Sequence, residues 1–267
     1  MKKTINRMDF LNKYGIEDQF NQSGLDWEQL MCIVEHFDNT RSDYEKIASD
    51  YVKVISGFSH IHSVKYRIKR VDSLLEKIIT KRYDYLNDIE PINEKNYMKH
   101  ITDLIGIRII YLFKSDYLEI HNQLMKKYFD FLVQDVHIYL KDGDDPKIYK
   151  DIKKPVFEVN DFYRSIHYTL RATNDRDSPR IEIQTRTIFE EAWGEINHEL
   201  VYKNRNSSEY LFLIQASQIL SSLTGECDRF SSLMKDVNNN YIKKLSEQIT
   251  TERVMQEVMN DFLHKKI

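Results

Sequence analysis

Glycine is scarce in this chain, and the common glycine-rich nucleotide-binding turns are missing. Only seven of the 267 residues are glycine, and neither GxxxxGK[ST] nor GxGxxG occurs. Such turns hold phosphate groups on backbone N–H groups at the start of a helix. HExxH and GxSxG are also absent, as is a His-Asp doublet of the metal-phosphohydrolase type. If the protein binds nucleotides, its side chains must therefore hold the phosphates.

Cysteine is scarce as well, and long apolar runs are lacking. Cys32 and Cys227 do not have CxxC spacing and cannot form a metal cage alone, so the cysteine content fits a reducing compartment. No segment approaches the roughly 20 apolar residues of a membrane span, and the first residues lack an apolar run of signal-peptide length. The net charge of −3 argues against binding nucleic acid by bulk positive potential. We expect a cytoplasmic protein without a membrane partner.

The chain does contain regular helical and strand patterns, within a composition that is 41% hydrophobic and 30% charged. Apolar residues at three- and four-residue spacing predict two helices over 26–60 and another over 67–82. From 188 onward the chain is predicted to be mostly helical, with helices at 189–203 and 209–237 and then a charged helix to the end. Alternation with a period of two predicts four strands, at 106–113, 131–140, 164–172 and 180–187. A long polar connection, 142–162, separates the second and third strands. This order favours the α+β class, with a mixed sheet flanked by helices.

The predicted helix 67–82 has a row of cationic and hydroxyl side chains. Lys69, Ser73 and Lys77 recur at intervals of four and would share one helix face, with Arg67 near the same edge. Ammonium, hydroxyl and guanidinium groups in one row could hold a polyphosphate. A solvated lysine face is the alternative, and it is the more common reason for such a row.

The segment ITDLIGIRIIYLF places Asp103 just before a strand and Arg108 within it. A carboxylate in that position could hold Mg²⁺, which takes one or two carboxylates together with substrate phosphate oxygens. Asp103 could equally serve as a turn or cap residue. Arg108 interrupts an apolar strand, and a half-buried arginine normally needs an anionic partner.

Each of the predicted strands 164–172 and 180–187 has one polar face. Alternation groups Tyr163, Ser165 and His167 on the first face, and Glu182, Gln184 and Arg186 on the second. All are common strand residues, but a tyrosine can stack on a nucleobase and a histidine can donate to phosphate. If the two strands pair, Glu182 shares a surface with Tyr163 and His167 and could contact Mg²⁺ or act as a base.

In order along the chain, these segments resemble the synthetase domain of the RelA/SpoT family, which transfers pyrophosphate from ATP to the 3′-hydroxyl of a guanine nucleotide. The first three motifs are R-x-K-x-x-x-S-x-x-x-K at 67–77, D-x-x-G-x-R at 103–108 and Y-[RQ]-S-[LI]-H at 163–167. They are followed by E-[IV]-Q-x-R-T at 182–187 and by a helix similar to W-A-x-x-E-H-x-x-x-Y-K, which keeps Trp193, His198, Tyr202 and Lys203. Each motif is weak alone, but five in order at family spacing are a strong signal.

Within the family, the chain most resembles the small, single-domain alarmone synthetases. This resemblance implies a fold, a reaction and residue roles. It implies a nucleotidyltransferase-like mixed sheet of the five-stranded type in residues 45–204, with helical extensions at 1–44 and 205–267. It also implies Mg²⁺ held by Asp103 and Glu182, with Glu182 activating the acceptor hydroxyl. The residues implied to bind ATP are Arg67, Lys69, Ser73, Lys77 and Arg108. Those implied to bind the GDP or GTP acceptor are Tyr163, His167, Gln184 and Arg186. The C-terminal helices are implied to form a homo-oligomer.

The chain departs from the family on the acceptor side. Family members usually carry D-Y-I-x-x-P-K-x-N-G-Y before the serine-histidine strand, and here Val159, Asp161 and Phe162 stand in place of its Lys, Asn and Gly. Two alternatives therefore stay open. One is a toxic family member that modifies an adenine nucleotide or the tRNA 3′ end, with the lysines of 147–154 meeting the RNA backbone. The other is a non-catalytic nucleotide-binding protein.

Overall fold

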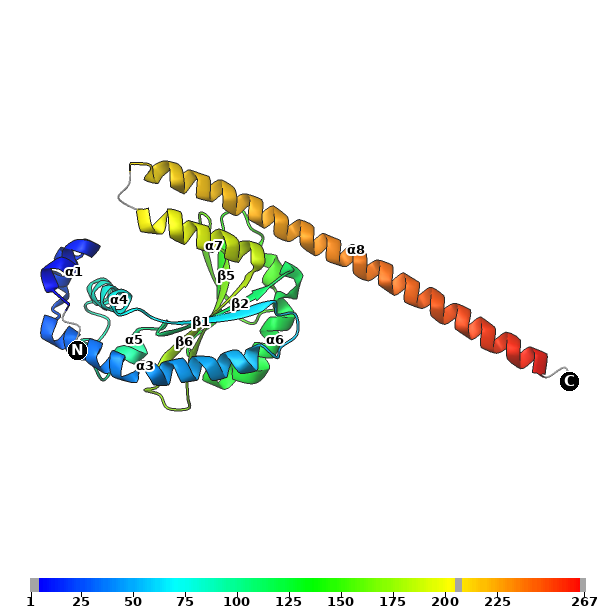
Figure 1. The fold of residues 1–267 in the computed structure, drawn as a ribbon, viewed down its shortest axis with the longest axis horizontal. Helices are drawn as coiled ribbons and strands as arrows, with labels where there is room; N and C mark the ends of the chain where they lie inside the picture. Colours follow the sequence, from blue (N-terminus) through cyan, green and yellow to red (C-terminus); the bar gives the residue numbers. More distant parts are fainter. Residues whose placement is uncertain (1–4, 205–207, 265–267) are drawn as a thin grey trace.

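The computed structural model describes residues 5–204 and 208–264, and its centre is a six-stranded sheet (Figure 1). The strands are β1 (Ser63–Ile68), β2 (Ile105–Tyr111), β3 (His137–Lys141), β4 (Val156–Asn160), β5 (Ser165–Arg171) and β6 (Arg180–Thr187). They lie in the order β1-β2-β6-β5-β3-β4. β2 pairs with β6 and β3 with β4 in parallel, while the other three neighbouring pairs are antiparallel. The predicted mixed sheet is confirmed, with six strands instead of five.

The two strands that alternation did not predict, β1 and β4, are the two edges of the sheet. β1 ends within the segment 67–82 that was predicted as helix, and β4 lies within the predicted polar connection 142–162. Edge strands are less covered than central ones, and the side chains at 65–67 and at 156, 157 and 159 are exposed. These strands therefore lack the alternation that marks a half-buried strand.

The helix predicted over 67–82 begins later than expected, because α4 spans Val71–Asp84. The predicted row of polar side chains is therefore divided. Arg67 lies on β1, Lys69 lies between the two elements, and only Ser73 and Lys77 lie on α4. The backbone N–H of Lys69 still donates to the chain just before β2 (3.0 Å), so strand pairing continues to this residue and delays the helix.

Helices cover both faces of the sheet. α3 (Trp27–Ile55) and α6 (Tyr117–Tyr128) lie along one face, and α7 (Ile188–Leu200) with the first part of α8 (Tyr210–His264) lies along the other (Figure 1). The other helices are α1 (Arg7–Tyr14), α2 (Glu17–Ser23), α5 (Tyr97–His100) and the 3₁₀ turns Lys114–Asp116, Phe129–Phe131, Pro146–Tyr149 and Tyr202–Asn204. The side chains of Ile107, Ile109 and Ile183 point into the main core and are almost fully buried. α3 is one continuous helix where the sequence predicted two, and the domain boundary predicted at residue 44 falls within it.

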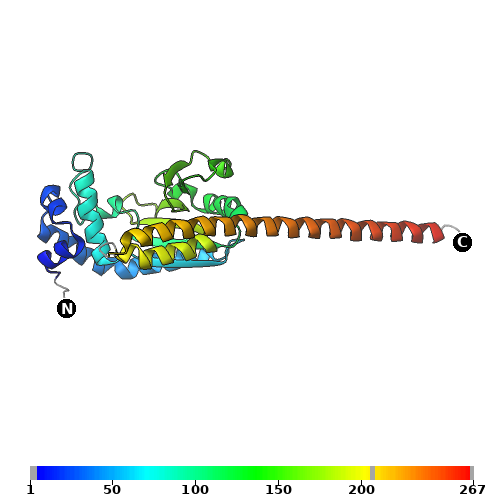
Figure 2. The ribbon, with the colours of Figure 1, turned by 90° about the horizontal axis from the view of Figure 1, so that it is seen from above.

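α8 is a single helix of 55 residues, where the sequence predicted two. Its first part packs beside α7, and the remainder extends away from the sheet (Figure 1 and Figure 2). Every side chain from 236 to 257 is exposed. No helix in the described part of the chain is long and apolar enough to span a bilayer.

Candidate active site

A pocket of about 590 Å³ lies where the polar faces of β2 and β6 meet α7. This volume is within the range of small-molecule sites. The parallel pairing sets Gly106 opposite Glu182 and Arg108 opposite Gln184, so the two strands together form one polar floor. Of the residues that the sequence singled out, these line the pocket: Arg67, Gly106, Arg108, Tyr163, Glu182, Gln184, Arg186, Trp193 and His198.

Glycine at position 106 makes room for Arg67 at this floor. The two residues are partners in the β1–β2 register. A Cβ atom built on Gly106 would lie 3.3 Å from Cγ and 3.4 Å from Nε of Arg67, which is tight for a Cβ contact. The side chain of Arg67 therefore crosses β2 at the one residue of that strand without a side chain.

Five side chains form a connected line of polar contacts on the floor. Arg186 donates to the phenolic oxygen of Tyr163, which lies 2.9 Å from Nε2 of His167, and Nδ1 of His167 lies 3.5 Å from Glu182. Gln184 donates to Glu182 (2.5 Å) and accepts from Arg186 (2.9 Å). The imidazole ring of His167 thus lies between the two residues, with Nε2 toward the phenolic oxygen of Tyr163 and Nδ1 toward the carboxylate of Glu182. The predicted common surface of these residues is confirmed.

Glu182 is a largely buried carboxyl group that nevertheless stays ionised. Burial alone would raise its pKa, and so would the negative charge of Asp103 nearby. The hydrogen bond and charge of His167, with the hydrogen bond from Gln184, outweigh both and lower the pKa. At neutral pH this carboxylate can therefore accept a proton from a bound hydroxyl group.

Asp103 lies between the two lysines of the divided row. Nζ of Lys69 is 2.6 Å from one carboxylate oxygen, and Nζ of Lys77 is 2.8 Å from the other. Burial alone would raise the pKa of Asp103, but the charges of Lys77 and Lys69 lower it to about 2. Lys69 itself is buried, which lowers its pKa although Asp103 opposes this. The connection before α4, α4 itself and the turn before β2 thus bring two cations and an anion together beside Glu182.

Arg108 has the anionic partners that its position in an apolar strand predicted, and both come from α7. Its Nη1 donates to the carboxylate of Glu191 (2.9 and 3.1 Å) and to that of Glu195 (2.5 Å). Burial alone would lower the pKa of Arg108, but these contacts raise it. Glu191 is also 3.6 Å from Nη1 of Arg186 and 3.5 Å from Nζ of Lys65. One buried carboxylate therefore holds three cations at the pocket.

Aromatic rings form another wall of the pocket. The guanidinium carbon of Arg186 lies 4.9 Å from the ring centroid of Tyr163. The ring of Trp193 on α7 lies 5.5 Å from Phe162 and 6.2 Å from Tyr163. Phe162, which stands where the family has glycine, thus contributes to the pocket wall. Flat rings at this distance from cations suit a base attached to phosphates.

The remaining predicted residues lie beside the pocket or outside the described side chains. His167 contacts Glu182 from β5, and Ser73 is a half-buried residue on α4. Tyr202 lies in the 3₁₀ turn after α7. The side chain of Lys203 lies outside the described residues, as do residues 1–4, 205–207 and 265–267 of the predicted extensions.

The carboxylates present are compatible with Mg²⁺. Asp103 and Glu182 are neighbours, and their lowered pKa values make both anionic at neutral pH. Among the described residues, no group of three or more His, Cys, Asp or Glu side chains could hold a metal ion. Mg²⁺ commonly takes only one or two protein carboxylates and fills its other positions with phosphate oxygens and water. The site fits such an ion and does not fit a metal that needs a full protein cage.

The sequence reasoning missed Glu191 and Glu195, which hold Arg108. They are four residues apart on one helix, so they share a face. They could have been predicted, because Arg108 in an apolar strand needs an anionic partner. The other pocket residues that it did not assign are Lys65, Tyr66, Ile107, Phe162, Gly194 and Asn197. Lys65 and Tyr66 lie on the edge strand that alternation did not reveal.

The chain matches a family of known proteins. The family whose model is described as the region found in RelA / SpoT proteins matches residues 66–207. The chain is 27% identical over 186 residues to the GTP pyrophosphokinase YwaC of Bacillus subtilis, covering 68% of this chain and 77% of the relative. It is 27% identical over 193 residues to the GTP pyrophosphokinase YjbM of the same organism, covering 70% and 79%.

A solved structure has the same fold. The small alarmone synthetase 1 from Bacillus subtilis superposes with a TM-score of 0.55, covering 77% of this chain and 99% of that chain. The two sequences are 20% identical in this superposition, so the likeness concerns the fold alone. It confirms the predicted mixed sheet flanked by helices.

Proposed function

The chain belongs to the RelA/SpoT family, and from this premise we propose that it is a GTP pyrophosphokinase. The enzyme transfers pyrophosphate from ATP to the 3′-hydroxyl of GDP or GTP and so makes the guanosine tetra- or pentaphosphate alarmone. Two relatives that the chain covers over more than three quarters of their length have this activity in their names. The observation that carries the proposal is the line of contacts from Arg186 to Glu182, because it ends on an ionised carboxylate at the pocket floor.

Glu182 acts as the general base of the transfer. The acceptor 3′-oxygen forms a bond to the β-phosphorus of ATP, the bond from that phosphorus to the oxygen bridging the α-phosphate breaks, and AMP leaves. The hydroxyl proton passes to Glu182, whose pKa is held low by His167 and Gln184 in spite of burial. His167 fixes the direction of the carboxylate, and Tyr163 fixes that of His167. Such a reaction depends mainly on positioning and on neutralising charge.

The ATP phosphates are held by cations instead of glycine turns. Arg67 and Arg108 line the pocket, and Lys69 and Lys77 flank Asp103 beside it. Ser73 lies one helical turn before Lys77 on α4 and adds a hydroxyl group. ATP competes with Glu191 and Glu195 for Arg108, because both carboxylates contact its guanidinium group.

The acceptor nucleotide lies against the aromatic wall. Tyr163 stacks on the guanine base, and Arg186, Gln184 and His167 meet the sugar and phosphates from the strand floor. Support comes from the position of Arg186 over the Tyr163 ring, which places a cation and a flat ring together at the pocket. Stacking of this kind is worth roughly 1–3 kcal/mol per base.

Asp103 and Glu182 are the residues that would hold Mg²⁺. The ion, when bound, neutralises charge on the transferred phosphate groups. Each oxygen of Asp103 keeps a lone pair beyond its lysine contact. The lysines thus hold the carboxylate in place without using all of its acceptor capacity.

The test is product formation from purified protein with ATP, Mg²⁺ and GDP or GTP. We expect AMP and a guanosine alarmone in equal amounts. Glu182→Gln should slow the reaction by about 10²- to 10⁴-fold, the usual contribution of a general base. Glu158→Gln is the matched control, because Glu158 also pairs with a histidine (2.5 Å from His137) but lies on edge strand β4. A Glu182→Gln rate equal to that of the control would contradict the proposal.

The relatives favour a guanine acceptor over the adenine-nucleotide and tRNA alternatives, because both carry the name GTP pyrophosphokinase. ADP, ATP and tRNA belong in the same assay as competing acceptors. A non-catalytic binding protein would give no AMP with any acceptor. An enzyme whose substrates are ATP and GTP is expected in the cytoplasm, and we propose this location.

We also propose that α8 carries a homo-oligomer interface. Its outer part has an exposed apolar row at three- and four-residue spacing, made of Phe230, Met234, Val237, Tyr241, Leu245 and Ile249. Most of the stability of a helix in a protein comes from packing of an apolar face, and an apolar row is typical of a helix that packs against another. A second copy of α8 offers the same row and covers it symmetrically.

A further inference from the structure

The segment that brings Phe162 and Tyr163 to the pocket is held by hydrogen bonds from two sides. Asn160, the last residue of β4, accepts from the backbone N–H groups of Phe162 (3.1 Å) and Tyr163 (2.5 Å). From the other side, the hydroxyl group of Ser221 on α8 donates to the carbonyl oxygen of Phe162 (2.6 Å). α8 supplies none of the described lining residues, yet it contacts the segment that does.

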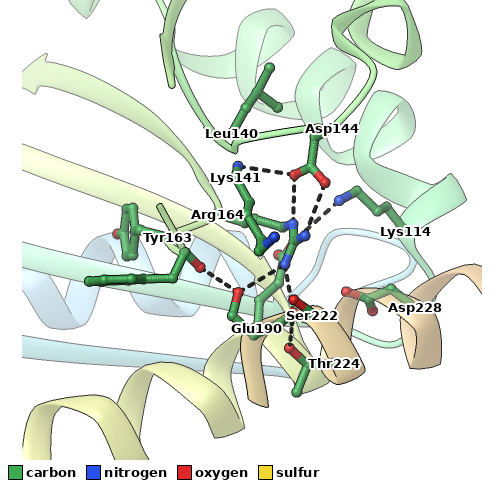
Figure 3. Close-up of polar contacts among 12 residues, drawn as sticks. Lys114, Leu140, Lys141, Asp144, Tyr163, Arg164, Glu190, Ser222, Thr224 and Asp228 are labelled. Carbon is green, nitrogen blue, oxygen red and sulfur yellow. Dashed lines mark hydrogen bonds and ion pairs between the residues drawn. The ribbon is translucent and has the colours of Figure 1, made fainter. Parts of the chain in front are cut away.

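Arg164 ties the same segment to α8 a second time (Figure 3). Its guanidinium group binds both carboxylate oxygens of Asp144, through Nε at 2.6 Å and Nη2 at 2.9 Å. Its Nη1 donates to the carbonyl oxygen (2.9 Å) and the hydroxyl oxygen (3.1 Å) of Ser221. Arg164 is 8% exposed and Ser221 is 1% exposed. Breaking one of these bonds would leave a polar group buried without a partner.

A glycine in α8 provides the space that this guanidinium group occupies. A Cβ atom built on Gly225 would lie 3.0 Å from Nη2 and 3.2 Å from both Cζ and Nη1 of Arg164. Glycine is among the least favourable residues for the interior of a helix, so α8 gains nothing locally from having it. The space needed by Arg164 accounts for glycine at this position.

We propose that Arg164, Ser221 and Gly225 are positioning residues through which α8 sets the place of Phe162 and Tyr163 in the pocket. The inference rests on the proposed function, because it takes these two aromatic residues as the acceptor side. The three residues act on the acceptor through the backbone of the aromatic segment. The residues proposed for ATP lie on β1, β2, α4 and the connection before α4. Disturbing the α8 contact therefore weakens acceptor binding and spares ATP binding.

Gly225→Ala is the most selective test. Alanine favours the helix itself, while its Cβ atom pushes Arg164 away from Ser221. We expect the KM for GDP to rise roughly tenfold to a hundredfold, as for loss of a buried hydrogen bond to a charged group, with the KM for ATP nearly unchanged. Ser222→Ala is the matched control, because Ser222 is exposed on the same helix and its hydroxyl bonds only within it (3.0 Å to Gln218). It should leave both KM values unchanged.

Arg164→Lys provides a second test of the same contact. Lysine cannot bind Asp144 with two parallel donors, and it lacks the planar group that Gly225 accommodates. We expect this variant to raise the KM for GDP by itself, and adding Gly225→Ala should then have little further effect. Fully additive effects, or a rise in the KM for ATP as large as that for GDP, would overturn the proposal.

Hydrogen exchange separates this proposal from the proposed function. If the wild-type protein makes no alarmone from any guanine nucleotide, the proposed function fails, but amide exchange at 161–164 still reports on the contact with α8. Faster exchange there in Gly225→Ala, with exchange in 180–187 and the Tm unchanged, supports the positioning role. Unchanged exchange at 161–164 overturns it.

Discussion

At the scale of single residues, burial and neighbouring charges shift the pKa values of two carboxyl groups, Asp103 and Asp228, in opposite directions. Lys77 and Lys69 hold the pKa of Asp103 at about 2 although burial opposes them. Asp228 on α8 is fully buried, and this burial together with the negative charge of Glu190 raises its pKa to about 7. The two aspartates should therefore affect stability with opposite dependence on pH.

Asp228→Asn is expected to stabilise the protein at alkaline pH. The folded pKa of Asp228 lies above the ordinary value of 3.8, so the native state binds this proton more tightly, and wild-type stability falls as pH rises from about 4 to about 7. Thr187, Lys114 and Arg164 face the carboxyl group and only partly oppose the effect of Glu190. We expect a gain of about 1–3 kcal/mol in the free energy of unfolding at pH 8, smaller at pH 5, in urea titrations. The same pH dependence in both proteins would contradict this.

Asp103→Asn is expected to destabilise the protein, so its effect on the free energy of unfolding has the opposite sign to that of Asp228→Asn. The folded pKa of about 2 lies below 3.8, so the stability that Asp103 contributes is present above about pH 4 and is lost as pH falls through about 2. The variant also leaves Lys69 and Lys77 without their anionic partner. We expect a loss of about 2 kcal/mol at pH 7 that shrinks below pH 4, measured by urea denaturation. A loss that stays constant with pH would mean that Asp103 contributes through its shape and not its charge.

At the scale of elements, the position of a strand in the sheet decided whether alternation revealed it. β2, β5 and β6 are central strands, and each has buried apolar residues on the core side, so their existence was predicted. β1 and β4 are edges on which half or more of the side chains are exposed, and they were missed. Each of α3 and α8 was predicted as two helices because a polar stretch, such as 38–43 in α3, interrupts the apolar spacing, whereas the backbone stays helical through it.

The start of α7 permits a prediction at this scale, because Thr187 and Glu190 form a capping box. The Thr187 hydroxyl oxygen accepts from the N–H of Glu190 (3.1 Å), and the Glu190 carboxylate accepts from the N–H of Thr187 (2.9 Å). Thr187→Ala should cost about 1–2 kcal/mol in thermal or urea unfolding, since it also removes the hydroxyl that donates to Asp228 (2.9 Å). Thr187→Ser keeps these bonds and should stay near wild type. Equal losses in the two variants would argue against the cap.

At the scale of the whole molecule, α8 links the pocket to a surface far from it. It contacts the aromatic segment through Ser221 and then extends beyond the sheet with an exposed apolar row (Figure 2). If this row is the oligomer interface, a neighbouring copy of the chain contacts the same helix that positions Phe162 and Tyr163.

Stability is therefore expected to depend on protein concentration. Association through α8 favours the folded state by mass action, so the Tm should rise with concentration. Val237→Glu places a charge in the apolar row and should abolish both the rise and the larger species in analytical ultracentrifugation. Asn239→Glu lies on the opposite side of the helix and serves as the control. A monomer at all concentrations in the wild-type protein would contradict the interface.

The sequence by itself determined the residue types of the site, the α+β class and the grouping of Glu182, Gln184 and Arg186 on one strand face, because alternation is a local property. The tertiary structure decided which faces meet. β5 pairs with β6, and this pairing brings His167 next to Glu182. Lys69 lies before α4 and not on it, and Glu191 of α7 is the partner of Arg108. Strand pairing and charge neutralisation bring together residues that are far apart in the chain. Such contacts cannot be predicted from the periodicity within one segment.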